Sequence, residues 1–269
     1  MRVVAPEPVH RYLEDGPDAT QGCERPLRRE GSQRLMGVLI AIEGIDGAGK
    51  RTQADRLLAR CREKGRTAGL LSFPRYGGTF TAETIADYLN GRYGSIEGID
   101  SRLPAVLFAV DRLESRAVIR DHLETDDVLI CDRYVPSNLA YQGARREPAD
   151  RDGFFAWLAH LEYDLCGLPR PDVTVFLDID PTSAAELVAR KDARAYTTKA
   201  ADLHESNHEF LIACRNAYAA LRATDFVGAW IEVPCLNPDG TLRDPESIEA
   251  QIWSQVAPRL DPNVHDDPR

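Results

Sequence analysis

The chain has 269 residues, of which 43% are hydrophobic and 28% are charged, and its formal net charge is −10. This length supports a single α/β domain with a full core, and the composition excludes wholesale disorder. The negative charge argues against sequence-independent binding to nucleic acid, which depends on many Lys and Arg contacts to phosphates. A small phosphorylated ligand held by a few local arginines remains compatible with it.

The ends of the chain differ in character from its middle. Residues 1–35 combine proline, glycine and mixed charge with no continuous apolar segment, which predicts a disordered or loosely attached N-terminal extension. A functional tail is one alternative, and translation from Met36, directly before the first predicted strand, is another. Residues 261–269 are predicted to be a flexible tail. The domain itself is expected over residues 36–260.

Cysteine spacing and hydropathy bear on the cellular compartment. Six cysteines show neither CxxC pairs nor metal-ligand spacing, which is typical of incidental thiols in a cytoplasmic protein. No apolar run approaches the length that spans a bilayer, so no membrane partner is expected.

The most informative stretch begins with a Val/Ile-rich run over residues 38–42, which predicts a buried strand. Apolar residues at helical spacing from about Lys50 predict a helix after it. The turn between them reads Gly44-Ile45-Asp46-Gly47-Ala48-Gly49-Lys50, which matches the phosphate-binding loop pattern. Glycines let backbone N–H groups converge on an anion, the helix N-terminus adds its positive dipole end, and Lys50 can reach the outer phosphates. The alternative is a glycine-rich turn that binds nothing.

One position departs from the usual phosphate loop. Arg51 follows the lysine where Ser or Thr commonly supports Mg²⁺, and Thr52 comes one residue late. A metal at this site must therefore depend more on carboxylates. The candidate nucleotide-binding residues are Gly44, Asp46, Gly47, Ala48, Gly49, Lys50, Arg51 and Thr52.

A second strand is predicted over residues 67–73, followed by a helix over residues 82–90. The strand delivers Phe73, Arg75 and Tyr76 to the sheet edge that carries the phosphate loop, because parallel strands present their carboxyl ends together. These side chains suit a second phosphate or a sugar. A charged surface loop is the alternative.

A long amphipathic helix is predicted over residues 104–122, with Phe108 and Arg112 on one face. This pair could stack on a planar base and bond its edge, and ordinary core packing with an exposed arginine is the alternative. A third strand over residues 128–131 precedes Asp132 and Arg133. A carboxylate after such a strand is the usual second support for Mg²⁺ in phosphate-loop proteins, and a helix cap is the competing interpretation.

Asn138 and Tyr141 share a face of the next predicted helix. The polar connection over residues 191–204 lacks apolar periodicity and follows Arg190, which predicts a basic lid over a nucleotide rather than a solvated turn. Further strands are predicted over residues 173–178 and 230–233, and further helices over 152–165, from Ser183, over 205–222 and over 245–256. Strands that alternate with helices in this way predict a three-layer α/β/α fold with a five-stranded parallel sheet.

The strings EGIDGAGK, FPRYGG, LFAVDR, DRYVPSNLAYQGA and LPRPDVTVFLDIDP, in this order and spacing, resemble the thymidylate kinase family over residues 37–260. The DRY-x2-S-x2-AYQGA string is the most specific of them. The resemblance implies a P-loop NTPase-type fold, transfer of the γ-phosphoryl group of ATP to dTMP, Mg²⁺ and a homodimer. Competing functions are another nucleoside monophosphate kinase, a nucleotide-dependent switch and a catalytically retired homologue.

Carried over by position, the resemblance implies that Phe108 stacks on thymine, Arg112 bonds its edge and Asn138 helps to read the base. Tyr141 would lie against carbon 2′ of the sugar, where a ribose hydroxyl would clash. The remaining residues implied near the acceptor sugar or phosphate are Asp46, Phe73, Arg75, Tyr76, Arg133 and His204.

The resemblance also assigns catalytic and metal roles. Asp46 would face the 3′-hydroxyl and metal-bound water, and Glu205 would help to order the metal. His204 replaces an aromatic residue of the family, and Gly47 stands where one variant has arginine, so the chain resembles the lid-arginine variant. The candidate catalytic residues are Lys50, Asp46, Arg133, Arg190 and Arg194, and the candidate metal ligands are Asp46, Asp132 and Glu205.

Overall fold

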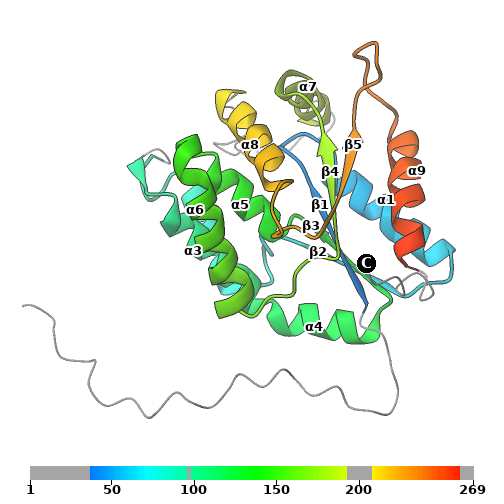
Figure 1. The fold of residues 1–269 in the computed structure, drawn as a ribbon, viewed down its shortest axis with the longest axis horizontal. Coiled ribbons are helices and arrows are strands. Elements are labelled where there is room, and N and C mark those ends of the chain that lie inside the picture. Colours follow the sequence, from blue (N-terminus) through cyan, green and yellow to red (C-terminus); the bar gives the residue numbers. More distant parts are fainter. Residues whose placement is uncertain (1–36, 96–97, 193–207, 261–269) are drawn as a thin grey trace, which may run out of the picture. The chain divides into compact units, whose positions relative to one another are not determined.

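The structure is a computed structural model that describes residues 37–95, 98–192 and 208–260. One five-stranded sheet runs through it in the order β2-β3-β1-β4-β5, with every neighbouring pair parallel (Figure 1). The strands are β1 (Val38–Glu43), β2 (Ala68–Ser72), β3 (Val128–Asp132), β4 (Val173–Asp178) and β5 (Ala229–Pro234). The predicted α/β fold with a five-stranded parallel sheet is confirmed.

Strand β1 lies at the centre of the sheet because β3 and β4 pair with its two edges. Ile42 pairs in register with Asp132 of β3, and Glu43 pairs with Phe176 of β4. The carboxyl ends of the three strands therefore lie together. The register therefore brings the phosphate loop after β1 and the Asp132-Arg133 pair at the end of β3 to one edge of the sheet.

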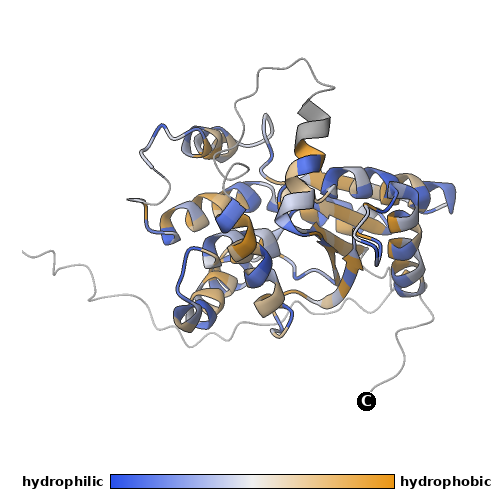
Figure 2. Ribbon diagram, turned by 90° about the horizontal axis from the view of Figure 1, so that it is seen from above, coloured by the Kyte–Doolittle hydropathy of each residue, from blue (hydrophilic) through white to orange (hydrophobic). Residues whose placement is uncertain are grey.

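Helices cover both faces of the sheet. Helices α1 and α9 pack together on one face, and α3, α5 and α8 pack in succession on the other (Figure 1). Figure 2 shows the strands mostly in the colour of hydrophobic residues, while the helices also carry hydrophilic ones. The helices are α1 (Lys50–Glu63), α2 (Phe80–Leu89), α3 (Arg102–Glu114), α4 (Arg116–Thr125), α5 (Val135–Gly143), α6 (Pro148–Ala159), the π-helical η2 (His160–Leu165), α7 (Pro181–Asp192), α8 (His208–Leu221), α9 (Pro245–Val256) and the 3₁₀ turn η3 (Ala257–Arg259).

The prediction of one long helix over residues 104–122 is wrong. Two helices, α3 and α4, meet at Ser115, a turn residue with φ −86° and ψ −5°. Its hydroxyl donates to the carbonyl oxygen of Asp111 at 2.9 Å, and Arg75 Nη1 donates to the same hydroxyl at 3.3 Å. A serine bonded back to the preceding turn bends a helix, which is a contact that apolar periodicity does not reveal.

Two other boundaries also differ. The helix predicted over residues 152–165 begins earlier, at Pro148, and its last six residues are π-helical. The predicted lid over residues 191–204 begins later, because α7 continues to Asp192. The rest of that connection, the N-terminal extension and the C-terminal tail lie outside the described residues. None of the helices in the described ranges combines the length and apolar character that crossing a membrane requires.

Candidate active site

The loop between β1 and α1 adopts a conformation that its glycines make accessible. Gly47 and Gly49 have φ values of 86° and 83°, in the left-handed region that L side chains rarely adopt. A Cβ on Gly47 would also lie 2.4 Å from the carbonyl oxygen of Ala184 in α7. Gly49 is the residue immediately before α1. The loop thus leads its backbone amides into a helix N-terminus, the arrangement that binds phosphate.

Lys50, the first residue of α1, is 93% buried beside this loop. Its Nζ donates to the carbonyl oxygen of Ile45 at 2.7 Å and lies 3.9 Å from Oδ1 of Asp46. Burial, and then the positive charge of Arg133, lower the pKa of Lys50 to about 8, although nearby carboxylates act in the opposite direction. An anion near Nζ would stabilise the charged form, so this position favours a phosphate.

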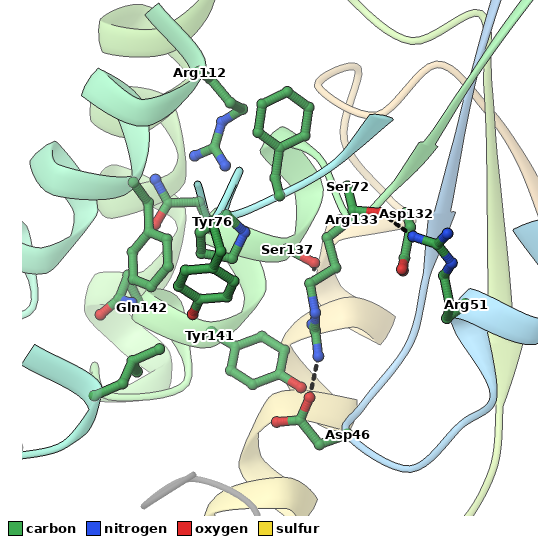
Figure 3. Close-up of a pocket in the computed structure, with 15 residues that line it drawn as sticks. Asp46, Arg51, Ser72, Tyr76, Arg112, Asp132, Arg133, Ser137, Tyr141 and Gln142 are labelled. Atoms are coloured by element: carbon green, nitrogen blue, oxygen red, sulfur yellow. Dashed lines mark hydrogen bonds and ion pairs between the residues drawn. The ribbon is translucent and has the colours of Figure 1, made fainter. Parts of the chain in front are cut away.

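A cavity of about 390 Å³ adjoins the loop (Figure 3). Ten residues singled out from the sequence line it, from α1, β3, α3, α5 and the adjoining loops: Asp46, Arg51, Phe73, Tyr76, Phe108, Arg112, Asp132, Arg133, Asn138 and Tyr141. The lining residues that sequence reasoning missed are Ser72, Pro74, Leu89, Ser137 and Gln142. Most of the candidate acceptor site is therefore brought together in space.

Arg133 occupies the middle of this group. It has φ 65°, a left-handed conformation that is uncommon for a residue other than glycine and marks functional sites when its surroundings hold it. Its guanidinium pairs with Asp46, donates to Ser137 Oγ at 3.4 Å and lies 5.1 Å from the centre of the Tyr141 ring (Figure 3). These contacts fix Arg133 between the phosphate loop and α5.

Glu43, the last residue of β1, lies fully buried beneath the site. Its carboxylate accepts bonds from the backbone N of Tyr134 at 2.8 Å, Ser137 Oγ at 2.5 Å and the hydroxyl of Tyr218 in α8 at 2.8 Å. Burial raises the pKa of Glu43, and the hydrogen bonds offset part of that rise. Sequence reasoning passed over this residue, although an acidic side chain at the end of a buried strand was a usable signal.

At the far side of the cavity, Arg112 is 98% buried rather than exposed. Its Nε and Nη2 each donate to the carboxylate of Glu162 at 2.6 Å. Asn138 Nδ2 donates to the same carboxylate at 2.7 Å and to the carbonyl oxygen of Ala105 at 2.9 Å. Glu162 was not predicted, because nothing in its own stretch of sequence points to α3.

Some predicted residues lie elsewhere. Arg75 does not line the cavity: its backbone N faces the carboxylate of Asp111 at 3.2 Å, and its side chain reaches Ser115. Thr52 is exposed on α1. Arg190 belongs to the last turn of α7, and Arg194, His204 and Glu205 lie outside the described residues.

Two carboxylates, Asp46 and Asp132, line the cavity where Mg²⁺ was predicted. In the described part of the chain, no three His, Cys, Asp or Glu side chains gather closely enough to hold a metal ion by themselves. One or two carboxylates supplemented by phosphate oxygens and water is nevertheless the donor set that Mg²⁺ prefers. The Arg51 side chain turns to Asp55 and Ser72, at 2.9 Å from each.

Comparison with known proteins gives consistent results. A family model described as thymidylate kinase matches residues 42–227. A thymidylate kinase from Mycobacterium tuberculosis is 37% identical over 196 residues, which cover 73% of this chain and 91% of that protein. One from Xanthomonas euvesicatoria pv. vesicatoria is 35% identical over 239 residues, which cover 86% and 90%. Among solved structures, thymidylate kinase from Candida albicans superposes with a TM-score of 0.61 at 22% identity, covering 83% of this chain and 92% of that one.

Proposed function

The chain belongs to the thymidylate kinase family, and on that premise we propose that its phosphate loop holds ATP and that the adjoining cavity holds dTMP. The reaction is ATP-dependent phosphorylation of dTMP, which gives dTDP and ADP. The observation that carries the placement is the position of Arg133, which contacts Asp46 of the phosphate loop on one side and Tyr141 of the cavity on the other. Arg133 therefore lies between the two proposed ligand sites, where its charge could act on a phosphoryl group that passes from one to the other.

The reaction requires the protein mainly to align the two substrates and to neutralise negative charge. The acceptor is a phosphate oxygen that is already anionic near neutral pH, so no strong general base and no covalent enzyme intermediate are needed. The loop amides and Lys50 would hold the β- and γ-phosphates, and Arg133 would neutralise charge on the migrating group. Arg190 would add positive charge from the end of α7, and Arg194 from the connection that follows it.

The cavity would orient dTMP by its base and sugar. Phe108 would stack on thymine, and Arg112 with Asn138 would face the base edge. Tyr141 would pack against carbon 2′ and exclude a ribose hydroxyl. Phe73 and Tyr76 would complete the wall, and His204 would approach the substrate from the connection after α7.

Mg²⁺ fits the oxygen donors on this side of the cavity. Asp46 and Asp132 would hold it together with phosphate oxygens, and Glu205 would help to order it. When bound, the ion would supply positive charge that neutralises negative charge developing on the phosphates. Replacing Arg51 with Ser supplies the usual hydroxyl, so the Mg²⁺ concentration for half-maximal rate should fall.

We also propose a homodimer in the cytoplasm. Leu103, Val106 and Leu113 lie along one side of α3 at helical spacing and are exposed by 64%, 38% and 36%, and Phe80 of the adjoining α2 is exposed by 85%. Apolar side chains gathered on one surface in this way are typical of a contact with another protein. In a two-fold interface, the same surface of a second copy would cover the exposed side chains of α3 and Phe80 of α2.

A coupled assay of ADP release tests the assignment. With ATP and Mg²⁺, dTMP should be the best acceptor among dTMP, dUMP, dCMP and dGMP. Substitution of Lys50 by Ala should lower kcat by several orders of magnitude while circular dichroism and thermal melting still report a folded protein. A better rate with another acceptor would make the chain a different monophosphate kinase, and ATP hydrolysis unaffected by dTMP would refute phosphoryl transfer to it.

A further inference from the structure

A single buried carboxylate contacts both side chains that face the proposed base edge. Glu162 belongs to η2 (His160–Leu165) and is fully buried, without lining the cavity itself. Its Oε2 accepts from Arg112 Nε, and its Oε1 accepts from Arg112 Nη2 and from Asn138 Nδ2, all at 2.6 to 2.7 Å. The orientation of both residues thus depends on one group behind them.

The contacts of Asn138 determine which end of its amide is left for a ligand. Nδ2 donates to Glu162 and to the carbonyl oxygen of Ala105, and both of these are acceptors. A half-turn of the amide would place Oδ1 against two acceptors, which is unfavourable. Oδ1 is therefore held in the other direction, where it is buried and accepts no hydrogen bond from the described residues. A buried acceptor without a donor is stabilised by a ligand N–H.

Arg112 presents the opposite polarity. Glu162 occupies the Nε and Nη2 edge of its guanidinium, and Nη1 bonds to no other side chain or carbonyl in the described ranges. Figure 3 shows the guanidinium directed toward the other residues that line the cavity. Because arginine can only donate, the ligand atom opposite Nη1 must accept.

An acceptor beside an N–H is the edge of a 4-oxo pyrimidine, whose O4 and N3–H lie next to each other. A 4-amino pyrimidine carries a donor and an acceptor in the same places, so it would meet two mismatches. We propose that Glu162 is a positioning residue that sets the hydrogen-bond polarity of this slot, so that the slot accepts thymine and rejects cytosine. This inference rests on the proposed function, since it takes the cavity to be the dTMP site.

The test is the preference for dTMP over dCMP in Glu162→Gln. Arg112 loses its ion pair, and whichever end of the new amide faces it, at least one of the three donors that now meet the carboxylate meets an N–H instead, so Arg112 and Asn138 are no longer both held in their present orientation. We expect the ratio of kcat/KM for dTMP to that for dCMP to fall at least tenfold, about 1.4 kcal/mol. Where dCMP turnover is too slow to measure, its inhibition constant against dTMP replaces it in the ratio.

Two further variants keep the test decisive. Glu249→Gln alters another buried carboxylate that binds an arginine through both oxygens, Arg60 at 3.0 and 2.9 Å, but outside the cavity, and it should leave the ratio unchanged. Glu162→Asp keeps the charge beside Arg112 but withdraws the carboxylate by one methylene. It should fold even if Glu162→Gln does not, and its ratio should also fall.

The outcomes separate the inference from its premise. A wild-type protein that does not phosphorylate dTMP would refute the proposed function itself. If the wild type does so, and the folded Glu162 variants lose activity toward dTMP and dCMP in equal proportion, Glu162 has a structural role only and the inference is wrong. A lowered ratio in Glu249→Gln would contradict it equally, because loss of any buried ion pair would then have the same effect.

Discussion

Lys50 should lower the free energy of unfolding of the protein although the activity depends on it. Its pKa falls from the usual 10.5 to about 8, chiefly because burial disfavours the charged form. The folded state therefore binds this proton less tightly than the unfolded state does. Replacing Lys50 with Met, a side chain of similar length without charge, should raise the free energy of unfolding at neutral pH while removing most of the activity.

The magnitude follows from that pKa. A pKa lower by about 2.5 than the usual value corresponds to about 3.5 kcal/mol, since one pKa unit is worth about 1.4 kcal/mol. Methionine also gives up the 2.7 Å bond from Nζ to the carbonyl oxygen of Ile45, which costs about 1 kcal/mol. The net gain in the free energy of unfolding for Lys50→Met below pH 8 is about 2.5 kcal/mol, or a melting temperature higher by about 7 °C for a domain of this size.

The pH dependence distinguishes this cause from better packing. The penalty of the charged ammonium is complete below pH 8, shrinks as the pH rises from about 8 toward 10.5, and is absent above that. Urea unfolding of both proteins at pH 7 and pH 10 should therefore show the advantage of Lys50→Met shrinking at the higher pH. A variant that is less stable at pH 7, or whose advantage does not change with pH, would refute the reasoning.

Three other substitutions address separate parts of the site. Gly47→Ala should weaken ATP binding at least fivefold but spare dTMP binding, because the new Cβ would clash with the carbonyl oxygen of Ala184 and φ 86° is unfavourable for alanine. Calorimetry with each ligand measures this, and an unchanged ATP affinity would contradict it. Tyr141→Ala should lower the preference for dUMP over UMP about tenfold, compared through kcat/KM, and an unaltered preference would remove Tyr141 from sugar selection. Leu103→Glu should halve the mass found by sedimentation, and an unchanged mass would exclude the α3 surface from the proposed dimer.

The parts of the fold that the sequence predicted well are those governed by local pattern. Residues 38–42 and 128–131 are short apolar runs with turn residues after them, and both proved to be strands within one residue at each end. Parallel pairing then places whatever follows each strand at the same edge, which is why Asp46 and Arg133 could be expected to meet. Ser115 shows the limit of this approach, since the break there depends on a hydroxyl contact with the preceding turn.

The parts that could not be predicted are contacts between distant segments. Glu162 lies 50 residues from Arg112 in sequence, and Glu43 lies 175 residues from Tyr218. In the sequence Glu162 is one acidic residue among many, and although Glu43 stood out at the end of a strand, only the packed structure shows which donors surround each carboxylate. Phe108 and Arg112 were expected on one helix face, but the orientation of the guanidinium is decided by a residue from η2.

The two principal arginines of the cavity are held in different ways, and the difference matches what each would have to do. Asp46 pairs with Arg133 and lies near Lys50, so an incoming phosphate competes with Asp46 for both cations, and the carboxylate that it releases would remain compensated by the proposed Mg²⁺. Arg112 and Glu162 form a bidentate pair away from solvent, and a neutral base edge has no charge with which to displace either partner. Arg133 is therefore suited to exchange partners as phosphate charge arrives and moves. Arg112 is suited to keep one orientation throughout, as selection among neutral bases requires.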